Sequence, residues 1–311
     1  MNILITGIHG FVGSNLVEAL KDIHEIYGLD IIQSPKDGIV KTFLWNEFEQ
    51  IPDVEIIIHL AGKAHDTKNK SESKDYFEVN TELTKKIYDY FLQSKAQKFI
   101  FFSSVKAAAD VVVGDSLQED VEPKPVGAYG ESKLAAENYI LNQKLRAKSQ
   151  EKEFYILRPA MIHGKGNKGN LNLLYNMVKK GIPYPLGAFE NKRSFTSIDN
   201  LIFIVKELLC KNIPSGIYNV ADDQTLSTNE LICLMSKVMN KRVKIWKLSP
   251  QFIYFSAKIG NLIHLPLNSE RLQKLTENYI VSNEKIKKAL NIYKLPVTAI
   301  EGLILTIKNF Q

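Results

Sequence analysis

The segment MNILITGIHGFVG, residues 1–13, decides the fold. An apolar run typical of a buried strand passes directly into three glycines with the spacing G-x-x-G-x-x-G. Glycines between a strand and a helix allow a tight turn, and they let a pyrophosphate approach the free N–H groups at the start of the helix. We therefore interpret this segment as a dinucleotide-binding loop. The residues expected to contact the dinucleotide are Gly7, Gly10, Phe11, Val12 and Gly13.

A carboxylate supports this interpretation at the end of the next expected strand. Asp30 lies 17 residues after Gly13. A carboxylate in this position accepts hydrogen bonds from both hydroxyls of a ribose and repels a 2′-phosphate. The two features together predict NAD as the cofactor and disfavour NADP.

Strands and helices alternate through the first 160 residues. Expected strands span residues 2–6, 25–30, 40–44, 54–60, 98–103 and 154–158, and expected helices span 12–21, 75–92 and 129–148. The almost continuously apolar runs IIIHL and FIFF are typical of strands that are covered on both faces. This order predicts an α/β fold with a doubly wound parallel sheet of the Rossmann type.

The sequence changes in character after the first 160 residues. Glycines and loops dominate at first, and helical patterns dominate from residue 227 onward. We expect a smaller, mostly helical substrate-binding lobe beside the sheet. The expected dinucleotide-binding domain is 1–163, rejoined by about 191–221, and the expected lobe is 164–190 with 222–311.

Composition and charge restrict the class of protein. The chain has 311 residues, of which 45% are hydrophobic and 24% charged, so it can bury a full core and is too apolar for a disordered chain. Its net charge of +6 arises from mixed signs, which favours a small anionic ligand over nucleic acid. No histidines or carboxylates lie at metal-ligand spacing, so no metal site is predicted.

No membrane span is predicted, because no apolar run reaches about 18 residues. Polar residues interrupt the longest candidate, residues 252–267, which we interpret as a buried or interfacial helix. Cys210 and Cys233 lie in apolar helical contexts without CxxC spacing. They predict buried free thiols and a cytoplasmic location.

A serine, a tyrosine and a lysine form the expected catalytic group. Tyr129 and Lys133 lie four residues apart, so a helix places them on one face. An ammonium near a phenol favours the phenolate, and this predicts a lowered pKa for Tyr129. Ser104 ends the strand KFIFFSS, where it can bind the substrate hydroxyl from which Tyr129 takes a proton. Ser103 is the rival for that role.

The spacing of Tyr129 and Lys133 recurs elsewhere in this lysine-rich chain. Tyr175 and Tyr254 each have a lysine four residues later. Neither has a partner hydroxyl nearby in the expected fold, so we assign both to surface or packing roles.

Taken together, these segments resemble the extended short-chain dehydrogenase/reductases, and more narrowly their nucleotide-sugar epimerase/dehydratase branch. The resemblance covers almost the whole chain: TGIHGFVG (6–13), HLAG (59–62), VN (79–80), FSS (102–104), YGESK (129–133), LRPAMIHG (157–164), RSFTSIDNL (193–201), GIYNV (216–220) and IKKALNIYKLP (286–296). It implies NAD as cofactor, a nucleotide-sugar substrate such as a UDP-hexose, and Ser104, Tyr129 and Lys133 as catalytic residues. It also implies a homodimer formed through helices 75–92 and 129–148.

The resemblance assigns further contacts to single residues. Additional cofactor contacts are implied for Leu60, Ala61, Gly62, Asn80, Ser103, Tyr129, Lys133 and Pro159. On the substrate side, Asn170 and Leu171 are implied at the nucleotide or diphosphate. Arg193 would clamp the diphosphate, with Arg271 as a second candidate, because a guanidinium fork suits phosphate. A surface salt bridge is the competing interpretation of both arginines.

Four departures from the family pattern concern function. VKAAAD (105–110) lacks the usual aromatic-glycine pair, His163 replaces a tyrosine, and FLWNEF (43–48) lacks the aspartate that contacts adenine in relatives. Val105 stands where dehydratases place the acid that eliminates water, so a dehydratase is disfavoured.

Three functions therefore remain. The first is a UDP-sugar 4-epimerase, which Asp30 favours because it selects NAD. The second is an NAD(P)H-dependent reductase of a UDP-4-keto-6-deoxy sugar in surface polysaccharide synthesis, which SSVKAAAD (103–110) and GKGNKGN (164–170) resemble more closely. The third is a dinucleotide-binding protein without catalysis, which the intact catalytic group disfavours.

Overall fold

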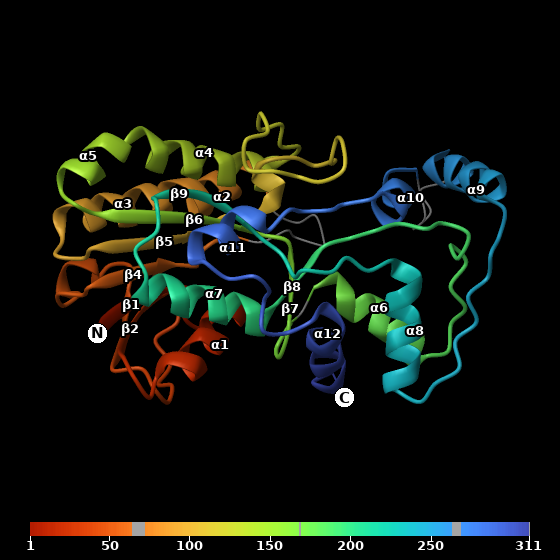
Figure 1. Ribbon diagram of the computed structural model, residues 1–311, viewed down its shortest axis with the longest axis horizontal. Coiled ribbons are helices and arrows are strands. Elements are labelled where there is room, and N and C mark those ends of the chain that lie inside the picture. Colours follow the sequence, from red (N-terminus) through yellow and green to blue (C-terminus); the bar gives the residue numbers. More distant parts are fainter. Residues whose placement is uncertain (64–71, 168, 263–268, 311) are drawn as a thin grey trace.

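The computed structural model describes residues 1–63, 72–167, 169–262 and 269–310. Its centre is a seven-stranded sheet in the order β3-β2-β1-β4-β5-β6-β9, in which all neighbours are parallel (Figure 1). The strands are β1 (Asn2–Thr6), β2 (Glu25–Asp30), β3 (Lys41–Leu44), β4 (Ile56–His59), β5 (Lys98–Phe102), β6 (Glu153–Pro159) and β9 (Gly216–Val220). The order reverses between β1 and β4, as in doubly wound dinucleotide-binding folds. The predicted fold class is confirmed.

Helices cover both faces of the sheet and build a second lobe. They are α1 (Phe11–Leu20), α2 (Ser73–Phe77), α3 (Leu83–Gln93), α4 (Ala128–Asn142), α5 (Lys144–Ser149), α6 (Asn170–Lys179), α7 (Ile198–Cys210), α8 (Thr228–Val238), α9 (Pro250–Leu262), α10 (Ser269–Thr276), α11 (Glu284–Leu290) and α12 (Ala299–Lys308). Shorter elements are the 3-10 turns η1 (Phe48–Gln50) and η3 (Val105–Ala107), the π-helical turn η2 (Glu78–Glu82), and the strand pair β7 (Met161–His163) and β8 (Phe195–Ser197). The helix expected over residues 75–92 is thus interrupted by a π-helical turn.

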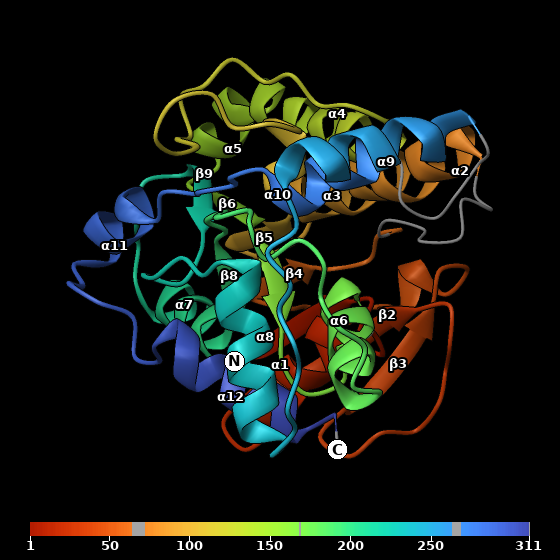
Figure 2. The ribbon, with the colours of Figure 1, turned by 90° about the vertical axis from the view of Figure 1, so that its right-hand side faces the viewer.

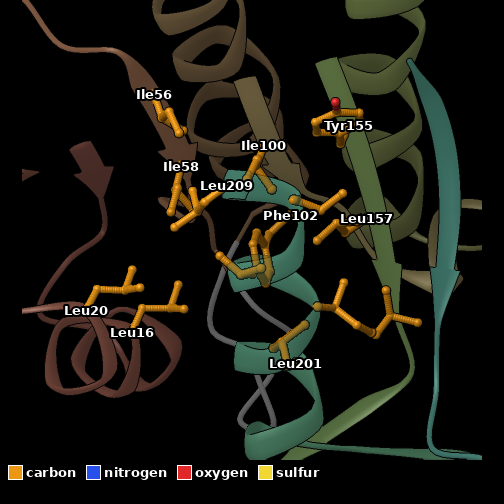
Figure 3. Close-up of a cluster of buried hydrophobic side chains, with 14 of the residues drawn as sticks. Leu16, Leu20, Ile56, Ile58, Ile100, Phe102, Tyr155, Leu157, Leu201 and Leu209 are labelled. Atoms are coloured by element: carbon orange, nitrogen blue, oxygen red, sulfur yellow. The ribbon is translucent and has the colours of Figure 1, made fainter. Parts of the chain in front are cut away.

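Apolar side chains hold the two helical layers on the sheet. Leu16 of α1 and Leu201 of α7 pack against Ile58, Ile100 and Leu157 of the sheet (Figure 3). Burial of one such side chain stabilises the fold by about 1.5–3 kcal/mol. The opposite face is covered by α3 and α4 with a separate cluster. Both layers therefore fix the strand ends from which the site is built.

The second lobe has its own core of buried side chains, among them Leu171, Tyr175, Ile232, Met235 and Leu303. Ser227 and Thr298 begin α8 and α12 with capping boxes, in which a serine or threonine and a glutamate satisfy the first N–H groups of the helix.

The helix α11 departs from the expected lobe assignment. Ile286 and Leu290 belong to the cluster under the sheet, and Lys285 donates to the carbonyl of Ile217 in β9. Residues 284–290 therefore pack with the dinucleotide-binding domain, although they lie within the expected lobe segment 222–311. The remaining division into two domains stays a prediction.

One expectation about burial was wrong, and another holds for only one side of a helix. Cys210 and Cys233 are free thiols, but both are exposed because they lie on the outer faces of α7 and α8. The apolar segment that was expected to be buried or interfacial forms α9 over part of its length, and Phe252 and Phe255 are exposed there. Residues 263–267 of that segment lie outside the described residues. No helix in the described ranges is long and apolar enough to cross a membrane.

Candidate active site at the carboxyl edge of the sheet

The glycine loop connects β1 to α1 with very little free space. Gly7 has a φ of +67°, a conformation that favours glycine, and its N–H donates to the carbonyl of Leu29 at 2.9 Å. A Cβ added to Gly13 would lie 2.6 Å from the Gly7 carbonyl oxygen and 2.7 Å from that of Ile8. Gly7 and Gly13 are thus required by the backbone, which passes close to the start of the helix.

The start of α1 is arranged to accept an anion. Gly10 is the N-cap and offers no side-chain cap, and the first turn, with Phe11 and Val12, contains no acidic residue. The N–H groups of a first turn have no acceptor within the helix, and the helix dipole adds positive potential there. A pyrophosphate therefore fits this position.

Asp30 ends β2 beside the glycine loop. Its carboxylate is buried and accepts hydrogen bonds from the N–H of His9 at 3.0 Å and from the N–H of Ile31 at 2.7 Å. The backbone of His9 thereby ties the glycine loop to β2. The Nε2 atom of His9 is buried without a hydrogen-bond partner in the described part of the chain, which leaves a polar atom beside the loop for a ligand.

The segment after β4 forms the opposite wall and carries the expected contacts Leu60, Ala61 and Gly62. The N–H of Ala61 donates to the Thr6 hydroxyl at 3.0 Å. A Cβ added to Gly62 would lie 3.0 Å from both Lys133 Nζ and Asn80 Oδ1, so this glycine brings the wall close to the expected catalytic lysine.

Asn80 lies in the π-helical turn η2 and is fully buried. Its amide donates to the hydroxyl of Ser132 at 3.0 Å and to the carbonyl of Lys63 at 3.1 Å, and it accepts from the N–H of Lys63 at 2.7 Å. The hydroxyl of Ser132 in turn donates to the carbonyl of Tyr129. Asn80 therefore connects the wall after β4 to the turn of α4 that carries the expected catalytic tyrosine. Sequence reasoning missed the role of Ser132 and the π-helical turn.

The three expected catalytic side chains converge at this edge. Ser104 lies two residues beyond β5 and caps the turn η3, and its hydroxyl forms a hydrogen bond with Tyr129. Lys133, one helical turn after Tyr129, is buried and donates to the carbonyl of Phe102 at 2.8 Å. The group therefore joins the end of β5 to the start of α4.

Burial determines the protonation of this group. It raises the pKa of Tyr129, and the hydrogen bond from Ser104 offsets this only in part. Burial also lowers the pKa of Lys133 to about 8. The expectation that Lys133 lowers the pKa of Tyr129 was therefore wrong for the protein alone, because removal from water disfavours the phenolate more than its surroundings stabilise it.

The structure decides between the two adjacent serines. The hydroxyl of Ser103 donates to the carboxylate of Glu137 in α4. Glu137 also pairs with Arg158 of β6, at 3.0 Å and 2.6 Å, and both side chains are almost completely buried. Ser103 is thus committed to this pair, and only its main chain is available for the cofactor contact implied above. Ser104 is left as the candidate for the reactive hydroxyl.

Sequence reasoning also missed the pair of Glu137 and Arg158. The available signal was a single arginine in the apolar strand YILRPA, because a buried arginine requires a carboxylate partner. Pro159, the next residue, ends β6 and is buried at the same edge.

On the substrate side, Arg193 lies in a segment that is connected through Tyr279 to the loop after Ser104. Arg193 pairs with Leu226 and Tyr279 in isolated bridges, and burial lowers the pKa of its guanidinium, which also lies near Glu277. The hydroxyl of Tyr279 donates to the carbonyl of Ala109, in the loop that follows Ser104. Tyr279 therefore links the segment of Arg193 to the loop that follows Ser104.

The other expected substrate contacts are less fully described. Leu171 is buried in the second core, so only its main chain can meet a nucleotide. Asn170 begins α6 and Arg271 lies in α10, but their side chains lie outside the described residues. His59 lies between the hydroxyls of Thr6 and Thr84, so its ring is a satisfied structural histidine.

Comparisons with known proteins agree with this geometry. The model of the NAD dependent epimerase/dehydratase family matches residues 3–221. The UDP-glucose 4-epimerase of Vibrio cholerae is 30% identical over 99% of this chain and 95% of its own length. The N-acetyl-alpha-D-glucosaminyl-diphospho-ditrans,octacis-undecaprenol 4-epimerase of Escherichia coli O157:H7 is 27% identical over 92% of this chain and 85% of its own length.

A reductase and a solved structure are also similar. The dTDP-4-dehydro-6-deoxyglucose reductase of Escherichia coli is 26% identical over 78% of this chain and 83% of its own length. The solved UDP-glucose 4-epimerase of Thermotoga maritima, with UDP-glucose, has a TM-score of 0.77 at 20% identity and covers 100% of this chain and 98% of that chain. At this identity the likeness shows the fold alone.

Proposed function

The chain belongs to the NAD-dependent epimerase/dehydratase family, and from this premise we propose that it is a 4-epimerase of a UDP-activated hexose. Membership of this family establishes that the protein is an enzyme that uses NAD. The observation that carries the specific reaction is the hydrogen bond between Ser104 and Tyr129, with Lys133 buried beside them. Position 105 carries a valine in place of the acidic residue that dehydratases use, and this disfavours a dehydration reaction.

The proposed reaction depends on one proton at the C4 hydroxyl of the sugar. Tyr129, as phenolate, takes this proton, while the hydroxyl of Ser104 holds the same sugar oxygen. Lys133 stabilises the phenolate by its charge. NAD, when bound, supplies the hydride acceptor and donor at C4. For inversion at C4 without net oxidation, NAD would accept and return the hydride on opposite faces of the sugar, and Tyr129 would give its proton back to the C4 oxygen.

The proposed cofactor contacts follow from the loop and its walls. The first turn of α1 would hold the pyrophosphate, and the carboxylate of Asp30 would accept hydrogen bonds from the hydroxyls of the adenosine ribose. Arg193 would hold the diphosphate of the substrate. The contacts proposed for Asn170, Leu171 and Arg271 complete the nucleotide side.

The test is incubation of the purified protein with UDP-glucose and with UDP-N-acetylglucosamine, followed by analysis of the products. We expect inversion at C4 without a net change in NADH absorbance. Oxidation of NADH or NADPH only with a UDP-4-keto-6-deoxy sugar would instead establish the reductase, which the Escherichia coli reductase relative and the segment SSVKAAAD favour. A sugar on a polyprenyl diphosphate is included as a third substrate, because one 4-epimerase relative carries that substrate in its name.

Cofactor choice provides a separate prediction. Asp30→Asn is expected to reduce the preference for NAD over NADP about tenfold or more. The neutral amide does not repel a 2′-phosphate, and the ribose hydroxyls of NAD lose one charged hydrogen-bond acceptor. The change keeps an oxygen for the N–H of His9. The measurement is the ratio of kcat/KM with the two cofactors. Asp37→Asn, a change at an exposed carboxylate after β2, is the control and should leave the ratio unchanged.

Assembly and location are proposed from the family resemblance. We propose a homodimer through the face of α3 and α4, where Tyr139 of α4 already donates to Asp89 of α3 at 2.6 Å within one chain. A cytoplasmic location agrees with two free cysteines. Sedimentation velocity tests the dimer: a single monomeric species at micromolar concentration would contradict it.

A further inference from the structure

The helix α9 presents an apolar stripe to solvent. Phe252, Phe255 and Ile259 follow each other at helical spacing, and Phe252 and Phe255 are 59% and 62% exposed. The opposite side of the helix is anchored, because Ile253 and Ala257 are buried in the core of the second lobe. The stripe is therefore held outward by a fixed helix and is not a frayed end.

The chain that leads into α9 extends the same surface. Trp246 is 49% exposed in the segment between α8 and α9. Figure 2 turns this end of the molecule toward the viewer, with α9 across the front and the preceding segment running beside α8. Exposed aromatic and aliphatic side chains thus occur in two successive segments, and together we call them the α9 face: Trp246, Phe252, Phe255 and Ile259.

The stretch of sequence that contains this face is rich in basic residues and has no acidic residue. Residues 231–269 contain Lys237, Lys241, Arg242, Lys244, Lys247 and Lys258, and no aspartate or glutamate. All six are exposed. The rest of the chain carries 34 basic and 34 acidic residues, so this stretch holds the whole net charge of +6.

The neighbouring segment adds to the same charge. Tyr184 pairs with Ile245, which brings the loop after α6 beside the segment between α8 and α9. The end of α6 and this loop carry the exposed residues Lys179, Lys180 and Ile182. No acidic residue occurs between residues 160 and 189. The excess of basic over acidic residues therefore occurs in both segments of the second lobe.

We propose that the α9 face binds the anionic surface of a phospholipid membrane. Exposed aromatic side chains on a helix, flanked by lysine and arginine, are typical of helices that lie in the lipid interface, where rings enter the headgroup layer and cations meet anionic lipids. A second copy of this chain fits the face poorly, because a symmetric contact would place two sets of positive charges opposite each other. The protein is then a peripheral membrane protein that presents its second lobe to the bilayer. This proposal does not depend on which sugar the enzyme converts.

The test is sedimentation of the full chain with vesicles. One set consists of phosphatidylcholine alone, and the other contains equal parts of phosphatidylcholine and phosphatidylglycerol. We expect binding to the anionic vesicles, with little binding to the neutral ones and a loss of binding at high salt. Absence of binding to the anionic vesicles overturns the proposal.

Two pairs of substitutions separate the apolar and the charged parts. Phe252→Ser with Phe255→Ser, and separately Lys244→Glu with Lys247→Glu, are each expected to weaken vesicle binding about tenfold or more. All four residues are exposed, so the fold should persist, and the melting temperature of each variant verifies this. Vesicle binding equal to that of the unchanged protein in either pair would contradict the assignment.

Matched controls lie on α5, at the opposite end of the molecule (Figure 1). Leu145→Ser removes an exposed apolar side chain there, and Lys144→Glu with Lys148→Glu reverses two exposed charges. Both controls should bind anionic vesicles as the unchanged protein does. If the serine pair instead converts a dimer into a monomer and leaves vesicle binding intact, the α9 face is a protein interface and the proposal fails.

Discussion

Tyr129→Phe is expected to lower the turnover number about a hundredfold or more, because the general base that acts on the C4 hydroxyl is lost. The ring itself is retained, so its edge contact with Tyr76, at 6.5 Å between ring centroids, should persist. Binding of NAD, measured by calorimetry, should change much less than turnover. A variant that keeps most of the turnover would remove Tyr129 from the catalytic role.

Tyr254→Phe is the matched control for this change. Tyr254 also has a lysine four residues later, but it lies on α9 with its ring against Phe189. The turnover number of the Tyr254→Phe variant should equal that of the unchanged protein. The comparison therefore separates the effect of position from the effect of a Tyr-x-x-x-Lys spacing.

The pH dependence follows from the same tyrosine. Burial raises the pKa of Tyr129, so the phenol of the folded protein is protonated at neutral pH. Since the reaction needs the phenolate, kcat is expected to increase from neutral to mildly alkaline pH. Tyr129→Phe should remove this increase from its residual activity.

The strands of the Rossmann sheet could be predicted from sequence because their signal is local. Apolar runs bounded by polar turns place β1 and β2 with both ends correct, and β4 and β5 within two residues. The start of α1 could also be predicted, because glycine spacing and helix periodicity meet at one point. The π-helical turn at Glu78–Glu82 could not, because its sequence has the same periodicity as the helix around it.

The remaining errors concern contacts between segments that are far apart. Ser103 and Ser104 are equivalent by position, and the choice between them depends on Glu137, which is 34 residues after Ser103. The pKa of Tyr129 was expected to fall, because spacing reveals a nearby lysine but not how deeply the phenol is buried. Cys210 and Cys233 were expected to be buried, because an apolar helix does not reveal which of its faces meets solvent.

Glu137→Ala is the second substitution with a large expected effect, which is a lower free energy of unfolding. The substitution leaves the guanidinium of Arg158 buried without a carboxylate, and removal of one partner of such a pair costs about 3–5 kcal/mol. Chemical denaturation should show a clearly lower unfolding midpoint. Glu82→Ala, which breaks the more exposed pair with Lys85, should shift stability by less than about 1 kcal/mol.

A double substitution tests whether the cost comes from the unpaired charge. Glu137→Leu with Arg158→Met replaces both ions by apolar side chains of similar size, and such replacements of buried pairs are often neutral or stabilising. We therefore expect the double variant to be more stable than Glu137→Ala. Its turnover should remain below that of the unchanged protein, because Ser103 loses the carboxylate that fixes the chain just before Ser104. A double variant as unstable as Glu137→Ala would show that packing around α4, and not the buried charge, determines the loss.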